Sequence, residues 1–411
     1  MGNLQDGEID YSDLVYSSDE EDIEKYYLLE NDLLFNRTNS AEWVGKTSIY
    51  RGDTPAIYAG YLIRIRTPLC GEYLNAVMNS VYAKNYCIRV KTDAVNQSNI
   101  NAQKLGTFLV PVAPIKEQHR IVTSFKRTFE FTQCIQSGKK ELSALIQSAK
   151  AKILDLAIRG QLVPQDPADE PASGLLDRIR TEKEELIRQG KIKRDKKESV
   201  IFRGEDNSYY EKMGTEVCCI NSEIPFGIPD TWEWVRLENC CSKEIRRGKS
   251  PKYAERSGTL VFAQKCNTKY NGIDVRQALF LDEATLNKYS ADEYMQDGDV
   301  VVNSTGTGTL GRVGFYRMAD NCLGLPIVPD SHVTVVRGFS SIQAFYLYAF
   351  MKASQSKLEK KGEGSTNQKE LKSLTLKEML VPVPPRTEQE RIAAAITAAF
   401  SNISTIEKSL S

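Results

Sequence analysis

Apolar residues recur at alternating steps of three and four in two long stretches of the chain. The later stripe consists of Ile392, Ile396, Ala399, Ile403, Ile406 and Leu410. The earlier stripe has the same register and consists of Ile121, Phe125, Ile135, Leu142, Ile146, Ala149, Ile153 and Leu156, with Thr128, Thr132 and Lys139 weakening its middle. So narrow a stripe is typical of a coiled-coil seam, so we predict two helices that pack on each other. Ser137-Gly138 predicts a bend or break in the first helix. The alternative is that each helix packs on its own domain.

Nearly the same motif precedes each helix. Residues 109–122 read LVPVAPIKEQHRIV, and residues 380–393, which lie 271 positions later, read LVPVPPRTEQERIA. Asn96-Gln97 recurs as Asn367-Gln368 at the same distance, and GKTSIYR at 45–51 parallels GRVGFYR at 311–317. Loop insertions between fixed elements account for the small drift in spacing. The prolines of the motif cannot continue a helix and mark the change from strand to helix. The chain is therefore predicted to contain two copies of one unit.

These signals predict an α+β fold of two β-rich domains with helices, joined by long helices that pair as an antiparallel coiled coil. The expected segments are a first domain at 1–114, a spacer helix at 115–160, a connector with a charged helix at 161–225, a second domain at 226–385 and a second spacer helix at 386–411. Strands are expected at Thr259–Ala263, Asp299–Asn303 and His332–Val336, and a helix at Phe345–Lys361. The first copy has no counterpart of Trp232–Gln264, so we expect it to be N-terminally incomplete and a poorer reader.

Composition narrows the functional classes. The 54 basic and 54 acidic residues balance, which argues against a nonspecific polycation but leaves local charge clusters possible. The nine cysteines show no CxxC spacing, which favours reduced thiols in the cytoplasm. No apolar run approaches the roughly 18 residues of a membrane span, and the chain opens on a polar, acidic stretch. We therefore expect a cytoplasmic protein without a membrane partner.

Motifs for catalysis and metal binding are missing from the sequence. The only histidines, His119 and His332, have no partner at a recognisable motif spacing and are interpreted as structural or surface residues. No Walker-type GxxxxGK[ST] motif occurs. Residues 306–311 (GTGTLG) fit GxGxxG, but strand-like residues follow where a dinucleotide-binding fold needs a helix. We therefore assign no catalytic residue and no metal ligand.

Three polar loops of the second domain are candidates for DNA contact. Their side chains suit phosphates and base edges, since arginine pairs with guanine and an amide pairs with adenine. Plain surface solubility is the alternative for each loop. The candidate DNA-binding residues are Arg246, Arg247, Lys249, Ser250, Lys252, Tyr253, Ser304, Thr305, Thr307, Arg312, Asn367 and Gln368.

Taken together, these elements resemble the specificity subunits of type I restriction–modification systems. The resemblance is carried by the two junction motifs, by LAIRGQLVPQ and LLDRIRTEKEELIRQGKIKRDKK in the connector, and by IPDTWEWVRL at 228–237. It implies two target recognition domains that read the halves of a split site in double-stranded DNA. It also implies a non-catalytic chain that holds two modification (adenine methyltransferase) subunits and the restriction subunits. S-adenosylmethionine, ATP and Mg would then be bound by those partners.

Two other classes compete with this interpretation. A methyltransferase fused to its own recognition domain would need an Asn-Pro-Pro-aromatic motif, which the sequence lacks. A scaffold with two non-DNA lobes on a coiled coil remains the alternative.

Overall fold

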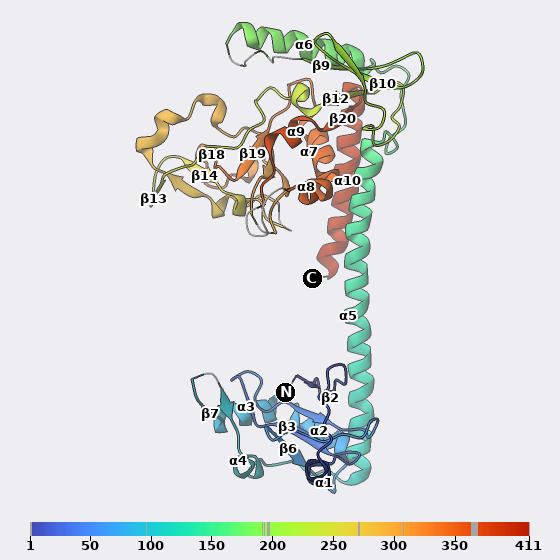
Figure 1. The fold of residues 1–411 in the computed structure, drawn as a ribbon, viewed down its shortest axis with the longest axis vertical. Coiled ribbons are helices and arrows are strands. Elements are labelled where there is room, and N and C mark those ends of the chain that lie inside the picture. The colour runs from blue at the N-terminus through green and yellow to red at the C-terminus, as the bar shows by residue number, and fades with distance from the viewer. Residues whose placement is uncertain are drawn as a thin grey trace. The chain divides into compact units, whose positions relative to one another are not determined.

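The protein has an α+β fold, as the sequence predicted, and divides into two compact units in a computed structural model (Figure 1). The first unit is Met1–Lys140 and the second is Glu141–Ser411. The structure describes residues 2–95, 97–190, 192, 194, 198–269, 272–306, 308–362 and 369–410.

The core of the second unit is built around β16 (Val300–Asn303), whose four residues are all buried. This strand pairs antiparallel with β17 (Val313–Phe315) and β19 (Val333–Val336). These strands are rich in valine, which suits a buried sheet because β-branched side chains pack well on a pleated surface. A second sheet has the order β13 (Tyr253–Ala254), β15 (Leu279–Leu281), β14 (Leu260–Phe262) and β18 (Ile327–Pro329). Strands are thus found within all three expected segments.

Two helices cover this region where the sequence predicted one. They are α7 (Ala344–Ala353) and α8 (Gln355–Lys360), and α7 contacts both β16 and β17. Ser354 separates them and ends α7 in the αR conformation. A further pair, β12 (Glu233–Arg236) and β20 (Leu380–Val383), is antiparallel and leads into the second long helix, with α9 (Ser373–Lys377) just before β20.

The first unit repeats this plan. Its central strand β3 (Leu33–Asn36) pairs antiparallel with β5 (Thr47–Ile49) and β6 (Leu62–Ile65). Two helices follow β6 along the chain, as α7 and α8 follow β19. The other elements are β1 (Leu4–Gln5), β2 (Glu8–Ile9), α1 (Glu20–Tyr26), β4 (Thr38–Asn39), α2 (Gly71–Met78), α3 (Val81–Val90), β7 (Thr92–Asp93), β8 (Ser98–Asn99) and α4 (Ala102–Gly106).

The same polar contacts recur in both copies. Arg66 pairs with the buried Asp32 just before β3, and Arg337 pairs with the buried Asp299 just before β16. At the junction motifs, Gln118 donates to Ala113 O at 2.8 Å and Gln389 donates to Pro384 O at 2.9 Å. The internal repeat in the sequence is therefore a repeat of structure.

The long helices are α5 (Ile115–Ile158) and α10 (Arg386–Leu410). α5 is one element of 44 residues that continues through Ser137-Gly138, so the expected bend is not an interruption of the helix.

Within the second unit, the end of α5 packs antiparallel on α10 (Figure 1). Lys150 Nζ lies 2.8 Å from Glu407 Oε1, whereas Ala157 shares an apolar cluster with Ile392 near the opposite end of α10. The seam differs slightly from the predicted one, because Ala149 is exposed and Leu154 is buried.

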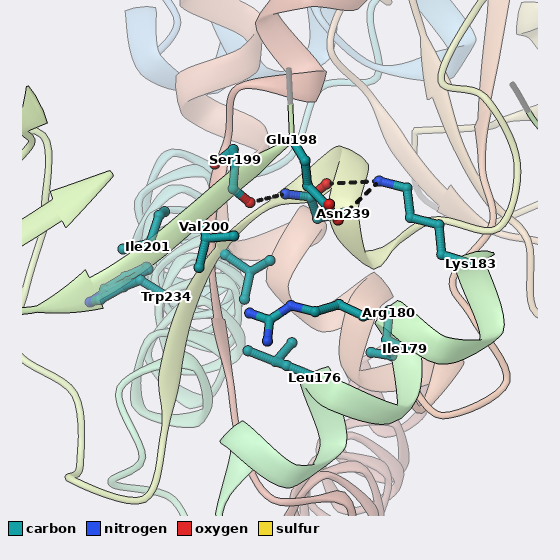
Figure 2. Close-up of a pocket in the computed structure, with 11 residues that line it drawn as sticks. Leu176, Ile179, Arg180, Lys183, Glu198, Ser199, Val200, Ile201, Trp234 and Asn239 are labelled. Carbon is teal, nitrogen blue, oxygen red and sulfur yellow. Dashed lines mark hydrogen bonds and ion pairs between the residues drawn. The ribbon is translucent and has the colours of Figure 1, made fainter. Parts of the chain in front are cut away.

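The connector contains more structure than the predicted helix. After α6 (Ala172–Arg188), the chain forms an antiparallel sheet of β9 (Ser199–Arg203), β10 (Tyr209–Met213) and β11 (Glu216–Cys219). Leu176 and Ile179 of α6 face Val200 and Trp234 across a small cavity (Figure 2). The connector is thus part of the second unit's core.

Candidate nucleic-acid interface

The segment Lys243–Tyr253, here called the basic turn, is held against the second unit by its backbone. Arg247 forms a β-bridge with Thr334, and Gly248 N donates to Val333 O at 2.9 Å. A Cβ atom at Gly248 would lie 2.2 Å from Pro329 O, so only glycine fits this approach. The turn therefore presents its side chains from a fixed position.

Two of the predicted DNA contacts in this turn share one buried carboxylate. Arg246 forms an ion pair with Glu293, and Lys249 Nζ lies 3.3 Å from the same carboxylate. The side chain of Glu293 is 4% exposed. Burial raises the pKa of Glu293, but the hydrogen bond and charge of Arg246, together with Lys243 and Lys249, outweigh it, and the net pKa is lowered. Arg246 and Lys249 thus anchor the turn to the domain.

Arg247 has a different environment. Its guanidinium lies 2.8 Å from Glu370 Oε1, and the two side chains are 38% and 48% exposed. Solvent screens such a pair, so it contributes little to stability. Arg247 is therefore held in place by a partner that another anion can replace.

The glycine loop, Ser304–Arg312, connects β16 to β17 as a hairpin, so no helix follows GTGTLG. Ser304 is fully buried and its Oγ lies 2.7 Å from Thr334 Oγ1. Arg312 donates to Asn267 O at 2.8 Å and to Gly308 O at 3.1 Å. The side chains of Ser304 and Arg312 thus stabilise the loop from within the protein.

Thr305 of the glycine loop is linked to the basic turn through Glu370. Its Oγ1 is 2.6 Å from His332 Nδ1, and its backbone forms a β-bridge with Glu370. Since Glu370 also holds Arg247, the four side chains of one small surface come from four separate segments. We call Arg247, Thr305, His332 and Glu370 the polar cluster.

The remaining candidates divide into two groups. Ser250, Lys252 and Tyr253 are exposed at the end of the basic turn. Thr307, Asn367 and Gln368 lie outside the described residues. Sequence reasoning missed His332 and Glu370 as members of the site, because neither stands in a motif. The position of Glu370 two residues after the predicted Asn367-Gln368 loop was the one available signal.

Possible metal ligands, the cysteine thiols and the helices of the described residues bear on the other classes of site. None of their His, Cys, Asp and Glu side chains form a group of three or more able to hold a metal ion. Burial raises the pKa of Cys240 to about 12 and that of Cys266 to about 11, which disfavours the nucleophilic thiolate. Among the described helices, none combines the length and the apolar character that crossing a membrane requires.

Comparison with known proteins identifies the relatives of this chain. Residues 229–411 match the family described as "Type I restriction modification DNA specificity domain". The chain is 30% identical over 284 residues to the type I restriction enzyme EcoAI specificity subunit of Escherichia coli, covering 66% of this chain and 42% of that protein. It is 29% identical over 269 residues to the EcoEI specificity subunit of the same species, covering 64% and 40%. The chain thus matches about two fifths of the length of these relatives.

A solved structure shares the fold of almost the whole chain. It comes from work titled "Structural basis underlying complex assembly and conformational transition of the type I R-M system". The match has a TM-score of 0.60 at 17% identity and covers 93% of this chain and 77% of that one. This structural match bears out the fold, and the family and sequence matches bear out the resemblance that the sequence indicated.

Proposed function

We propose that this chain, which belongs with the specificity subunits of type I restriction–modification systems, binds double-stranded DNA and selects its target sequence. The observation that carries the proposal is the polar cluster in the matched specificity domain. A cation, a hydroxyl, an imidazole and a carboxylate meet there on loops that a rigid sheet positions. Loops on a rigid scaffold are common sites of recognition, and these groups can contact phosphates and base edges.

The repeat supports a target in two parts. Each unit places a loop and a short bridge after its central strand, so the chain offers two similar surfaces with different side chains. Two non-identical readers suit an asymmetric split site.

We also propose that the chain performs no chemistry and acts in the cytoplasm as the DNA-reading part of a larger complex. Two modification subunits and the restriction subunits would be its protein partners. The methyl donor S-adenosylmethionine, and ATP with Mg, would be bound by those partners. The exposed apolar side chains along the first part of α5, among them Phe125 and Ile135, support a helix that contacts other subunits.

Methylome sequencing of cells with and without this gene tests the function. We expect a split methylated motif that disappears when the gene is deleted. An unchanged methylome would contradict the proposal.

Titration of the purified chain with random duplex DNA at low and high salt tests the interaction directly. Binding that weakens steeply with salt is expected of a DNA-binding protein. If the chain does not bind the duplex at either salt concentration, the alternative of a scaffold with two non-DNA lobes would be favoured.

A further inference from the structure

The basic turn contains two kinds of ion pair. Glu293, which holds Arg246 and Lys249, is almost completely buried, whereas Glu370, which holds Arg247, is about half exposed. Displacing Glu293 would leave a buried carboxylate without its partners, which is costly. Displacing Glu370 would only return an exposed carboxylate to water. Of these two carboxylates, Glu370 is the one that an incoming phosphate can replace.

The fold does not require a carboxylate at the position of Glu370. The bridge between Thr305 and Glu370 has a counterpart in the first unit, where Thr38 pairs with Asn99 in a short antiparallel ladder. The following residue makes the same backbone bond in both copies, from Ile100 N to Arg37 O at 2.9 Å and from Leu371 N to Ser304 O at 2.8 Å. In the first unit the side chain is neutral, and Asn99 Nδ2 donates to Thr38 Oγ1 at 2.8 Å.

The charge of Glu370 therefore belongs to the recognition surface of the second unit and not to its architecture. A carboxylate on a DNA-facing surface repels every phosphate alike. It accepts hydrogen bonds only from donors such as the cytosine amino group. Beside Arg247, it competes with the backbone of any DNA sequence for the same guanidinium.

We propose that Glu370 is a specificity-determining residue that suppresses binding to nonspecific DNA by holding Arg247 until DNA displaces it. This inference rests on the proposed DNA-binding function. Nonspecific DNA must break the Arg247–Glu370 pair and bring a phosphate close to a free carboxylate. The chain then gains one contact between Arg247 and a phosphate. Repulsion between that phosphate and the exposed carboxylate of Glu370 cancels part of the binding energy of this contact.

The test measures binding of the full chain to a random 40-base-pair duplex over a range of salt concentrations. We expect Glu370→Gln to bind this duplex roughly three- to tenfold more tightly at low salt, with a salt slope steeper by about one. Glu370→Asn, which places the residue of the first unit at this position, should behave in the same way. Thermal unfolding of both variants should match that of the unmodified chain.

Glu390→Gln is the matched control. Glu390 forms an exposed ion pair with Arg386 at 2.9 Å on α10, and its replacement changes the net charge by the same amount. We expect it to leave duplex binding nearly unchanged. In an Arg247→Ala background, Glu370→Gln should lose most of its effect, because the cation that it releases is absent.

The outcomes separate this inference from the function on which it rests. If the unmodified chain binds the duplex but Glu370→Gln behaves as Glu390→Gln does, the role of Glu370 is wrong and DNA binding stands. The same conclusion follows if the gain persists in full without Arg247. If the unmodified chain shows no binding at any salt concentration, both proposals are overturned.

Discussion

Ile392 and Ile121 occupy the same position of the repeated junction motif, yet Ile392 is fully buried and Ile121 is 40% exposed. Ile392 packs in a cluster with Trp232 and with Leu154 and Ala157 of α5. The difference extends to the neighbouring glutamates. Glu388 is buried and accepts a hydrogen bond from Trp232 Nε1 at 2.9 Å, whereas its counterpart Glu117 is exposed. The same residue types of the junction motif therefore contribute more to the stability of the fold in the second copy than in the first.

Aspartate at these two positions should give very different stabilities. Ile392→Asp buries an unpaired carboxylate in an apolar cluster and should cost several kcal/mol of unfolding free energy. Ile121→Asp places the same charge on an exposed helix face and should change stability by no more than about 0.5 kcal/mol. Denaturant unfolding followed by tryptophan fluorescence measures the difference, since Trp232 lies in the affected cluster. Equal losses from both variants would show that the exposed stripe is covered in solution.

The sequence predicted the repeat, the fold class and the long helices because these depend on periodic apolar residues and on proline. It did not predict β9, β10 and β11, whose segments SVIFR, YYEKM and EVCC each carry a charged residue. β9 and β10 are only partly buried, and β11 is exposed. Their positions depend on contacts with distant residues, such as the pair between Glu211 and Arg236. The acid partners of the basic turn were missed for the same reason: Glu293 and Glu370 are distant from it in sequence and meet it only in the fold.

The Glu211–Arg236 pair should make stability depend on pH. Arg236 Nη2 lies 2.6 Å from Glu211 Oε2, and the side chains are 11% and 5% exposed. The hydrogen bond from Arg236 lowers the pKa of Glu211 most, against a smaller opposing effect of burial. The folded state therefore holds the charged form more strongly than the unfolded state does. Its stabilising contribution is complete above the usual glutamate pKa of about 4.3 and is lost as pH falls through the lower folded value.

Glu211→Gln should accordingly destabilise the protein at pH 7 by about 1–3 kcal/mol. The loss should be no larger, because Arg236 keeps a second partner in Glu223 at 3.0 Å. The difference from the unmodified chain should shrink as the pH is lowered below about 4. Urea unfolding at a series of pH values measures this. A difference that stays constant down to pH 3 would contradict the assigned pKa shift.

Two cations of the basic turn should respond differently to replacement by alanine. Arg246→Ala removes the main partner of the buried Glu293 and should lower stability by about 1–3 kcal/mol. Lys252→Ala removes an exposed side chain and should leave stability unchanged within about 0.5 kcal/mol. If Lys252 contacts a phosphate, its loss should also weaken duplex binding and reduce the salt slope by about 0.9. Comparing thermal unfolding with duplex titration separates the anchoring role of Arg246 from a DNA-contacting role of Lys252. A Lys252→Ala variant that unfolds at a lower temperature would contradict this division.

Gly248 tests whether the position of the basic turn matters for binding. A Cβ atom at this residue would lie 2.2 Å from Pro329 O and 2.4 Å from Asp330 O, and both are backbone atoms that the adjoining sheet holds. Gly248→Ala must therefore push the turn away from β18 and β19 and break the bond from Gly248 N to Val333 O. We expect a loss of about 1–3 kcal/mol and weaker duplex binding, since Arg247 moves with the turn.

Gly258→Ala provides the matched control for this substitution. The nearest atom to a Cβ at Gly258 is a side-chain oxygen of Glu283 at 3.8 Å, which is an ordinary contact. This variant should be as stable as the unmodified chain, or more stable by up to about 1 kcal/mol, because alanine restricts the unfolded chain more than glycine does. Hydrogen exchange at the amide of residue 248 reports directly on the turn. Slow exchange and undiminished duplex binding in Gly248→Ala would mean that the turn can accommodate a side chain and that its fixed position does not determine how Arg247 meets DNA.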